Sequence, residues 1–215
     1  MKDLKGYFYI FVLNRLTIVK TLINLFSVII IFTTLNIFFL NQLTTLKSSL
    51  VTKHNMLKKT IETNITIYNF NELSISHQAL INKAKEQVLK AYAPYSKFHV
   101  GAAVELENGE IFAASNQENS AYPSGLCAER VAMFFANAQY PDVPVKTLAI
   151  AAFTNGEFLK DPVTPCGSCR QVLLETEMRF EKNINILLYG TEQIYFIENV
   201  KQLLPLCFEK SSLQG

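Results

Sequence analysis

The chain has 215 residues and a formal net charge of +2, so it is long enough for one sizeable domain and an additional segment. It carries no basic block with interleaved aromatic residues, which argues against nucleic acid as a partner. Its four cysteines are too few for the disulfide framework of a small secreted domain, and their spacing favours metal ligation in a reducing compartment.

The first fifty-five residues differ in composition from the rest. Residues 22–40 contain no charged side chain and are just long enough to span a hydrocarbon core. Basic residues precede them, as in a signal anchor: Lys2, Lys5, Arg15 and Lys20. Met56 then opens a segment typical of the start of a soluble domain. We therefore divide the chain into a hydrophobic extension, 1–55, and a soluble domain, 56–215.

Two interpretations of the extension remain. We favour a start codon placed too early, which makes the protein cytoplasmic. The alternative is a genuine membrane anchor through residues 22–40.

The soluble part begins with a helix and a hairpin. A helix is predicted over 77–92, capped by Ser76 and stopped by Pro94. Strands are predicted over 100–106 and 110–115, with Asn108 and Gly109 in the turn.

A polar loop, 116–125, leads into the second half, which alternates helices and strands. The predicted elements are a helix over 127–138, a strand over 147–153, a helix from Pro165, strands over 184–190 and 193–197, and a short helix over 200–205. The apolar side of the 127–138 helix is predicted to hold Val131, Phe134, Phe135 and Ala138. This order predicts an α/β fold with three layers (α/β/α) around a mixed five-stranded sheet.

Three cysteines lie at predicted helix starts. Cys166 and Cys169 are almost one turn apart and face the same way, and Cys127 begins another helix. Helix N-termini stabilise thiolates, which are the form that zinc binds. Three protein ligands with a fourth position free is the pattern of catalytic zinc. A redox pair or half of a structural zinc site would also explain a Cys-x-x-Cys.

Glu129 lies two residues after Cys127, where it can reach the open position of a metal without ligating it. A carboxylate there could take a proton from water and pass it to a leaving nitrogen. Complementing the helix dipole is the simpler role for a lone first-turn glutamate. Cys-x-Glu followed by Pro-Cys-x-x-Cys is, however, the signature of zinc deaminases of cytosine and adenine.

Several further stretches follow the order of one family. From about residue 76 to residue 208 the chain resembles the small, three-cysteine, homotetrameric cytidine deaminases that act on free nucleosides. The matching stretches are "APYSKFHVGAAV", "NQENSAYPSGLCAER", "PCGSCRQVL" and "LLPLCF". The resemblance implies hydrolytic deamination of cytidine and 2′-deoxycytidine, one Zn²⁺ per chain, a nucleoside as partner and a homotetramer with shared active sites.

The resemblance also implies a role for each matching residue. Cys127, Cys166 and Cys169 correspond to the zinc ligands, and Glu129 to the proton shuttle. Asn116 and Glu118 correspond to the pair that binds the ribose 3′-hydroxyl, and Phe98 to the aromatic side chain that packs on the pyrimidine. Tyr122 and Phe208 correspond to residues that complete the site of a neighbouring subunit.

Arg130 has an electrostatic role on this interpretation. Three thiolates leave a zinc centre with net negative charge, and a guanidinium beside the sulfurs would offset it. The resemblance implies that Arg130 does so and that Gln171 helps to orient it.

Other functions are compatible with parts of this pattern. One is a related aminonucleoside deaminase on the same scaffold, although Asn116 and Glu118 argue against it. Another is a non-catalytic structural zinc domain with Cys207 as fourth ligand. A third is a membrane-tethered interaction protein with a vestigial domain.

Overall fold

The computed structural model describes residues 4–50 and 57–213, with side chains for 13–44 and 57–213. The chain divides into two compact units, Met1–Lys59 and Thr60–Gly215. The predicted boundary at Met56 lies outside the described residues.

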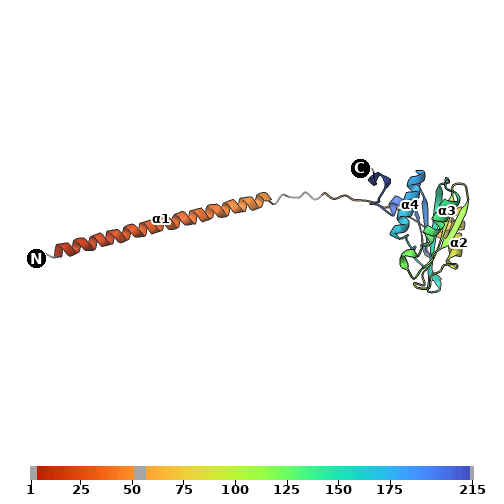
Figure 1. The fold of residues 1–215 in the computed structure, drawn as a ribbon, viewed down its shortest axis with the longest axis horizontal. Coiled ribbons are helices and arrows are strands. Elements are labelled where there is room, and N and C mark those ends of the chain that lie inside the picture. The colour runs from red at the N-terminus through yellow and green to blue at the C-terminus, as the bar shows by residue number, and fades with distance from the viewer. Residues whose placement is uncertain (1–3, 51–56, 214–215) are drawn as a thin grey trace. The chain divides into compact units, whose positions relative to one another are not determined.

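The first unit contains one continuous α-helix, α1 (Leu4–Leu50; Figure 1). Its segment Leu13–Thr44 contains an 18-residue window with a mean hydropathy of 2.2, none of it buried, so by length and composition the segment is able to cross a membrane. The hydroxyls of Thr17 and Ser27 donate to backbone carbonyls four residues earlier, which satisfies them within the helix. The predicted span 22–40 lies inside this segment.

The second unit is built on a seven-stranded mixed sheet in the order β1-β7-β6-β4-β2-β3, with β5 paired to β4. Only the β4–β6 pair is parallel. The strands are β1 (Thr66–Tyr68), β2 (His99–Leu106), β3 (Ile111–Ser115), β4 (Val145–Thr154), β5 (Glu157–Phe158), β6 (Asn185–Tyr189) and β7 (Ile194–Ile197). The prediction of five strands is wrong because β1 and β5 are too short to show a period-two pattern.

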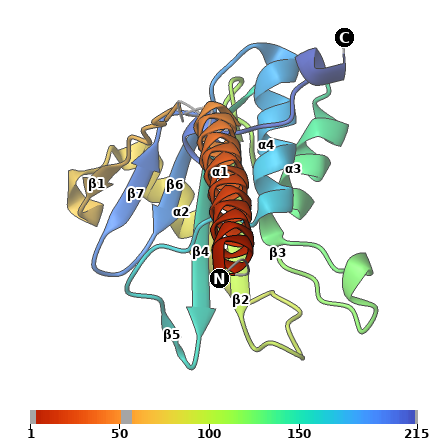
Figure 2. The ribbon, with the colours of Figure 1, turned by 90° about the vertical axis from the view of Figure 1, so that its left-hand side faces the viewer.

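Helices cover both faces of this sheet, as Figure 2 shows, which confirms the predicted three layers. The helices are α2 (Ile75–Val88), α3 (Ala128–Gln139) and α4 (Gly167–Phe180). Ala103 and Leu187 pack on the α2 side, and their neighbours Val104 and Leu188 pack with α3 and α4. Successive residues of a strand thus pack into two hydrophobic cores, one on each face of the sheet.

Two of the predicted helices, 77–92 and the one from Pro165, have boundaries that are wrong by a few residues. Ser74 caps α2, with its hydroxyl accepting from His77 N, and the helix ends at Val88. It stops before Tyr92 because that residue pairs with the loop at Gln117. Cys166 caps α4, so Pro165 precedes the helix instead of lying in its first turn.

The buried side of α3 also differs from the prediction. Small residues, Ala128, Ala132 and Ala136, together with Met133, face the sheet. Phe134 and Phe135 are 49% and 55% exposed. The helix is apolar on more than one side, and the small side chains allow the closest approach to the sheet, so periodicity alone chose the wrong face.

Gly101 and Glu177 each stabilise the packing of the domain at one point. A side chain at Gly101 on β2 would overlap the backbone carbonyl oxygen of Ala84 in α2, so only glycine allows this close contact. The carboxylate of Glu177, which is 7% exposed, accepts from Ile184 N at 2.8 Å and from Val200 N at 2.9 Å. Burial raises the pKa of Glu177.

Candidate active site

The N-termini of α3 and α4 bring three thiols together. Cys127 and Cys166 are the N-cap residues of these helices, and Cys169 lies in the first turn of α4. Their sulfurs all lie within 4.8 Å of one another, with 3.8 Å between Cys127 and Cys166 and 3.5 Å between Cys166 and Cys169. Tetrahedral zinc with bonds of about 2.3 Å separates its sulfur ligands by about 3.8 Å. The three thiols therefore fit one Zn²⁺.

Hydrogen bonds among the thiols favour the ionised form of Cys127. A hydrogen bond from Cys169 lowers the pKa of Cys127 to about 5, against the opposing effect of burial and with help from Arg130. The same hydrogen bond and burial raise the pKa of Cys169. Cys127 thus has the thiolate character that zinc requires.

Cys207 does not belong to this group. In the described part of the chain the metal-ligand cluster contains only the other three cysteines. The Cys207 thiol donates to Glu209 Oε1 at 3.0 Å instead. The arrangement leaves the fourth position of a bound ion to a ligand from outside these thiols, which is the pattern of catalytic rather than structural zinc.

Glu129, in the first turn of α3, is buried next to the thiols and only 5% exposed. Burial raises its pKa, as does the charge on Cys127, while a hydrogen bond with Cys169 opposes the shift. A buried carboxyl with a raised pKa is suited to hold a proton near neutral pH.

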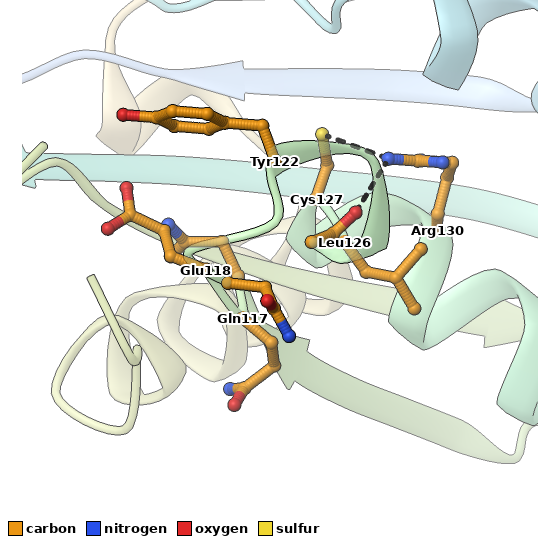
Figure 3. A pocket seen from close by; sticks show the side chains of 9 residues that line it. Gln117, Glu118, Tyr122, Leu126, Cys127 and Arg130 are labelled. Carbon is orange, nitrogen blue, oxygen red and sulfur yellow. Dashed lines mark hydrogen bonds between the residues drawn. The ribbon is translucent and has the colours of Figure 1, made fainter. Parts of the chain in front are cut away.

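Arg130, also in the first turn of α3, contacts Cys127. Its Nη2 donates to Cys127 Sγ at 3.8 Å and to Gly125 O at 3.5 Å (Figure 3). The hydrogen bond to Cys127 raises the pKa of Arg130. Its Nε is buried without a hydrogen-bond partner among the described residues. The guanidinium is thus placed to offset charge on the sulfur.

Gln171 does not contact Arg130 in the way its predicted role requires. Its Nε2 donates to the backbone carbonyl of Phe208 at 3.0 Å. Orientation of Arg130 by Gln171 stays a prediction without support from this geometry.

A cavity of about 270 Å³ opens beside Cys127, a size that suits a small molecule (Figure 3). Asn116, Glu118 and Tyr122 line it together with Cys127 and Arg130. In Figure 3, Cys127 lies between Glu118 and Tyr122 on one side and Arg130 on the other.

The two predicted sugar-binding residues are held by neighbouring backbone. Asn116 Oδ1 accepts from Val100 N at 2.8 Å, and its Nδ2 donates to Phe98 O at 2.9 Å. The carboxylate of Glu118 accepts from Tyr95 N, from Ser96 N and from the Ser96 hydroxyl. These bonds lower the pKa of Glu118, with the Ser96 hydroxyl as the largest cause. Sequence reasoning missed Ser96, although it lies in the matching stretch "APYSKFHVGAAV".

The remaining predicted substrate residues are more exposed. Phe98 is half-buried at the entrance of β2. Tyr122 is 78% exposed and Phe208 is 59% exposed in the single chain. Such exposure agrees with side chains that would enter a neighbouring subunit, a role that stays a prediction.

Comparisons with known proteins agree with this geometry. A family model described as the cytidine and deoxycytidylate deaminase zinc-binding region matches residues 74–182. The cytidine deaminase of Sporosarcina psychrophila is 42% identical over 138 residues, which cover 63% of this chain and 93% of that protein. The cytidine deaminase of Halalkalibacterium halodurans is 41% identical over 101 residues, 47% of this chain and 72% of that protein.

A solved structure is similar as well. The crystal structure of cytidine deaminase from Burkholderia pseudomallei matches with a TM-score of 0.52 and 37% sequence identity. The match covers 61% of this chain and 98% of that one.

Proposed function

The chain belongs to the cytidine and deoxycytidylate deaminase family, and from this premise we propose how its residues carry out the reaction. It is a zinc-dependent hydrolase that converts free cytidine and 2′-deoxycytidine to uridine and 2′-deoxyuridine and releases ammonia. The observation that carries the proposal is the joint position of three thiols within 4.8 Å and the buried carboxyl of Glu129 beside them.

Cys127, Cys166 and Cys169 hold the Zn²⁺. When bound, the ion supplies a Lewis acid that lowers the pKa of a water molecule and so provides a nucleophile at neutral pH. The protein itself contributes the positions of the three sulfurs. Cys127 and Cys166 are held at the N-caps of α3 and α4, and Cys169 lies in the first turn of α4.

Glu129 moves the protons of the reaction. It accepts a proton from the attacking water as the new bond forms at C4 of the pyrimidine, and it delivers that proton to N3. It then takes the remaining proton of the water from the new C4 hydroxyl and carries it to the amino group, which leaves as ammonia when the C4–N bond breaks and the C4 carbonyl forms. Burial raises the pKa of this carboxyl, which makes it a better proton donor than an exposed glutamate.

Arg130 balances the charge of the centre. Three thiolates and one Zn²⁺ sum to one negative charge, which the guanidinium 3.8 Å from Cys127 Sγ offsets. Withdrawing charge from the sulfur makes the ion a better Lewis acid.

Substrate binding uses the cavity beside the thiols. Glu118 and Asn116 bind the 3′-hydroxyl of the sugar, and Phe98 packs on the pyrimidine ring. A carboxylate at the 3′ position repels a 3′-phosphate, so free nucleosides are favoured over polymers. Ionisation of Glu118 is supported by the hydrogen bonds that lower its pKa.

The active form is a homotetramer in the cytoplasm. Tyr122 and Phe208 complete the pocket of a neighbouring subunit, and their exposure in the single chain supports this arrangement. Phe134 and Phe135 provide an apolar surface for subunit contact. A thiolate site needs a reducing compartment, so if α1 is an anchor the domain lies on the cytoplasmic side of the membrane.

The variant Glu129→Gln tests the proposal. It should retain one zinc per chain and the same thermal stability, yet lose turnover by about 10²–10⁴-fold or more, because an amide is similar in shape but can neither accept nor donate the transferred proton. Zinc is measured by elemental analysis and deamination by ammonia release. The exposed Glu175→Gln on α4 is the matched control and should behave as the parent. A zinc-loaded Glu129→Gln protein with near-normal turnover would overturn the assignment.

A further inference from the structure

We propose that Ser96 is a positioning residue of the nucleoside site, whose hydroxyl directs the Glu118 carboxylate toward the sugar and fixes the backbone of Phe98. The inference rests on the proposed roles of Glu118 and Phe98. It adds a residue that touches neither the thiols nor the reacting atoms.

The geometry around Glu118 leaves one defined position for a ligand. The Ser96 hydroxyl donates to Oε1, and Oε2 accepts from Tyr95 N at 2.9 Å and Ser96 N at 3.3 Å. An ionised carboxylate has about four acceptor positions. Three of them are occupied by the loop, so one acceptor position remains, on Oε1. Loss of the Ser96 hydroxyl would free a second position and remove the bond that orients this oxygen.

The same hydroxyl also acts as an acceptor. Phe98 N donates to Ser96 Oγ at 3.0 Å, and the Phe98 carbonyl accepts from Asn116 Nδ2 at 2.9 Å. Both peptide groups of Phe98 are therefore fixed, one by Ser96 and one by Asn116. Ser96 thus joins the sugar-binding carboxylate to the residue proposed to pack on the base.

The loop holds this arrangement through its own backbone. Lys97 has a φ of 57°, in the left-handed region, and its N–H donates to Ala93 O at 3.1 Å. This tight turn directs two consecutive N–H groups, those of Tyr95 and Ser96, at one carboxylate oxygen. Glu118 N also donates to Tyr92 O at 2.8 Å, so the segment that follows β3 is tied to the loop. The carboxylate is preorganised before any nucleoside binds.

Charge supports the same conclusion. The Ser96 hydroxyl is the largest cause of the lowered pKa of Glu118. Without it the pKa of Glu118 moves up, and the ionised form that accepts the sugar hydroxyl is lost at a higher pH. As the solution is acidified, the KM for 2′-deoxycytidine increases once Glu118 becomes protonated. In Ser96→Ala this increase should therefore begin at a higher pH than in the parent.

The decisive experiment compares two substrates on the full-length protein. 2′,3′-Dideoxycytidine lacks the hydroxyl that Glu118 and Asn116 bind, so the ratio of kcat/KM for 2′-deoxycytidine to that for 2′,3′-dideoxycytidine measures the contacts to the 3′-hydroxyl. We expect Ser96→Ala to reduce the ratio by about tenfold, through KM, since a hydrogen bond to a charged group is weakened. Ser96→Thr, which keeps the hydroxyl, should restore most of it.

Thr154→Val is the matched control. Its hydroxyl donates to Lys97 O at 3.2 Å and so holds the same loop without touching Glu118. The ratio should be unchanged in this variant even if stability falls. If Ser96→Ala does not fold, Ser96→Cys keeps the shape with a weaker donor and takes its place.

Glu118→Gln distinguishes a failure of the proposed role of Ser96 from a failure of the proposed role of Glu118. If Glu118→Gln lowers the substrate ratio and Ser96→Ala leaves it at the parent value, the role of Ser96 is wrong and the proposed function stands. If Glu118→Gln leaves the ratio unchanged, the proposed role of Glu118 is wrong and the role of Ser96 falls with it. An equal loss on both substrates in Ser96→Ala and Thr154→Val would show that the serine acts only on loop stability.

Discussion

Replacing Arg130 by alanine tests the charge balance of the sulfur cluster. Arg130 Nη2 lies 3.8 Å from Cys127 Sγ. Two unit charges at about 4 Å attract by about 4 kcal/mol at an effective dielectric constant of 20 and by about 1 kcal/mol in water. Because Arg130 is only partly buried, we expect a loss of about 1–2 kcal/mol, which is about 5- to 30-fold in zinc retention or in kcat/KM.

The assay follows zinc release to a chelator together with kcat/KM for cytidine. Arg130→Ala should release zinc faster, turn over more slowly, or both. Adding Cys127→His replaces a thiolate by a neutral ligand, which brings the ion and its ligands from one negative charge to zero, so the double variant should recover part of the loss. Arg179→Ala, in the last turn of α4, removes a guanidinium far along that helix from Cys169 and serves as the control. An Arg130→Ala protein that matches the parent in both measurements would refute the charge argument.

Five further predictions concern the fold, the assembly and the extension. Glu177→Ala should lower the free energy of unfolding by about 2–6 kcal/mol in urea titrations because two buried N–H groups lose their acceptor, whereas Glu177→Gln keeps a side-chain oxygen that can accept from both. The pKa of Glu177 is higher in the folded state than in the unfolded state, where it is about 4. The free energy of unfolding of the parent, relative to that of Glu177→Gln, should therefore fall as the pH rises from about 4 through the folded pKa. A difference that does not change with pH would contradict this. Gly101→Ala should lower stability by about 1–3 kcal/mol or more, seen as a lower Tm, and an unchanged Tm would contradict the close contact of α2. Phe134→Gln combined with Phe135→Gln should elute as a smaller species in size-exclusion chromatography with light scattering, and an unchanged mass would remove this face from the interface. A protein that begins at Met56 should be soluble, bind one zinc per chain and deaminate cytidine, and an inactive, insoluble product beside an active membrane-bound full-length chain would reverse the favoured interpretation of residues 1–55.

The metal centre was the part of the protein most accessible from the sequence. Its ligands lie at helix starts, and the spacing between Cys166 and Cys169 by itself puts two thiols on one side of a turn. The three-layer fold followed from the alternation of helices and strands in the same way. Both are local patterns, so a single sequence contains them.

Contacts between segments that are distant in the chain could not be predicted from the sequence. Ser96 and Glu118 are 22 residues apart, and only the folded loop brings the hydroxyl to the carboxylate. Gln171 was placed next to Arg130 by resemblance, but its side chain donates to the Phe208 carbonyl, 37 residues along the chain. The short strand β1 is defined by its partner β7 and not by any pattern of its own.

The wrong choice of the buried side of α3 carries physical information about assembly. A helix that packs on a sheet in a monomer normally leaves a polar side to solvent, and its periodicity then identifies the buried face. In α3 the alanine side is buried, while Phe134 and Phe135 remain about half exposed. Large apolar side chains on an outer helix face are stabilised when a second surface removes them from water. Because α3 also carries Glu129, contact at that face would rest on the same helix that positions the proton carrier, which links the proposed assembly directly to the active site.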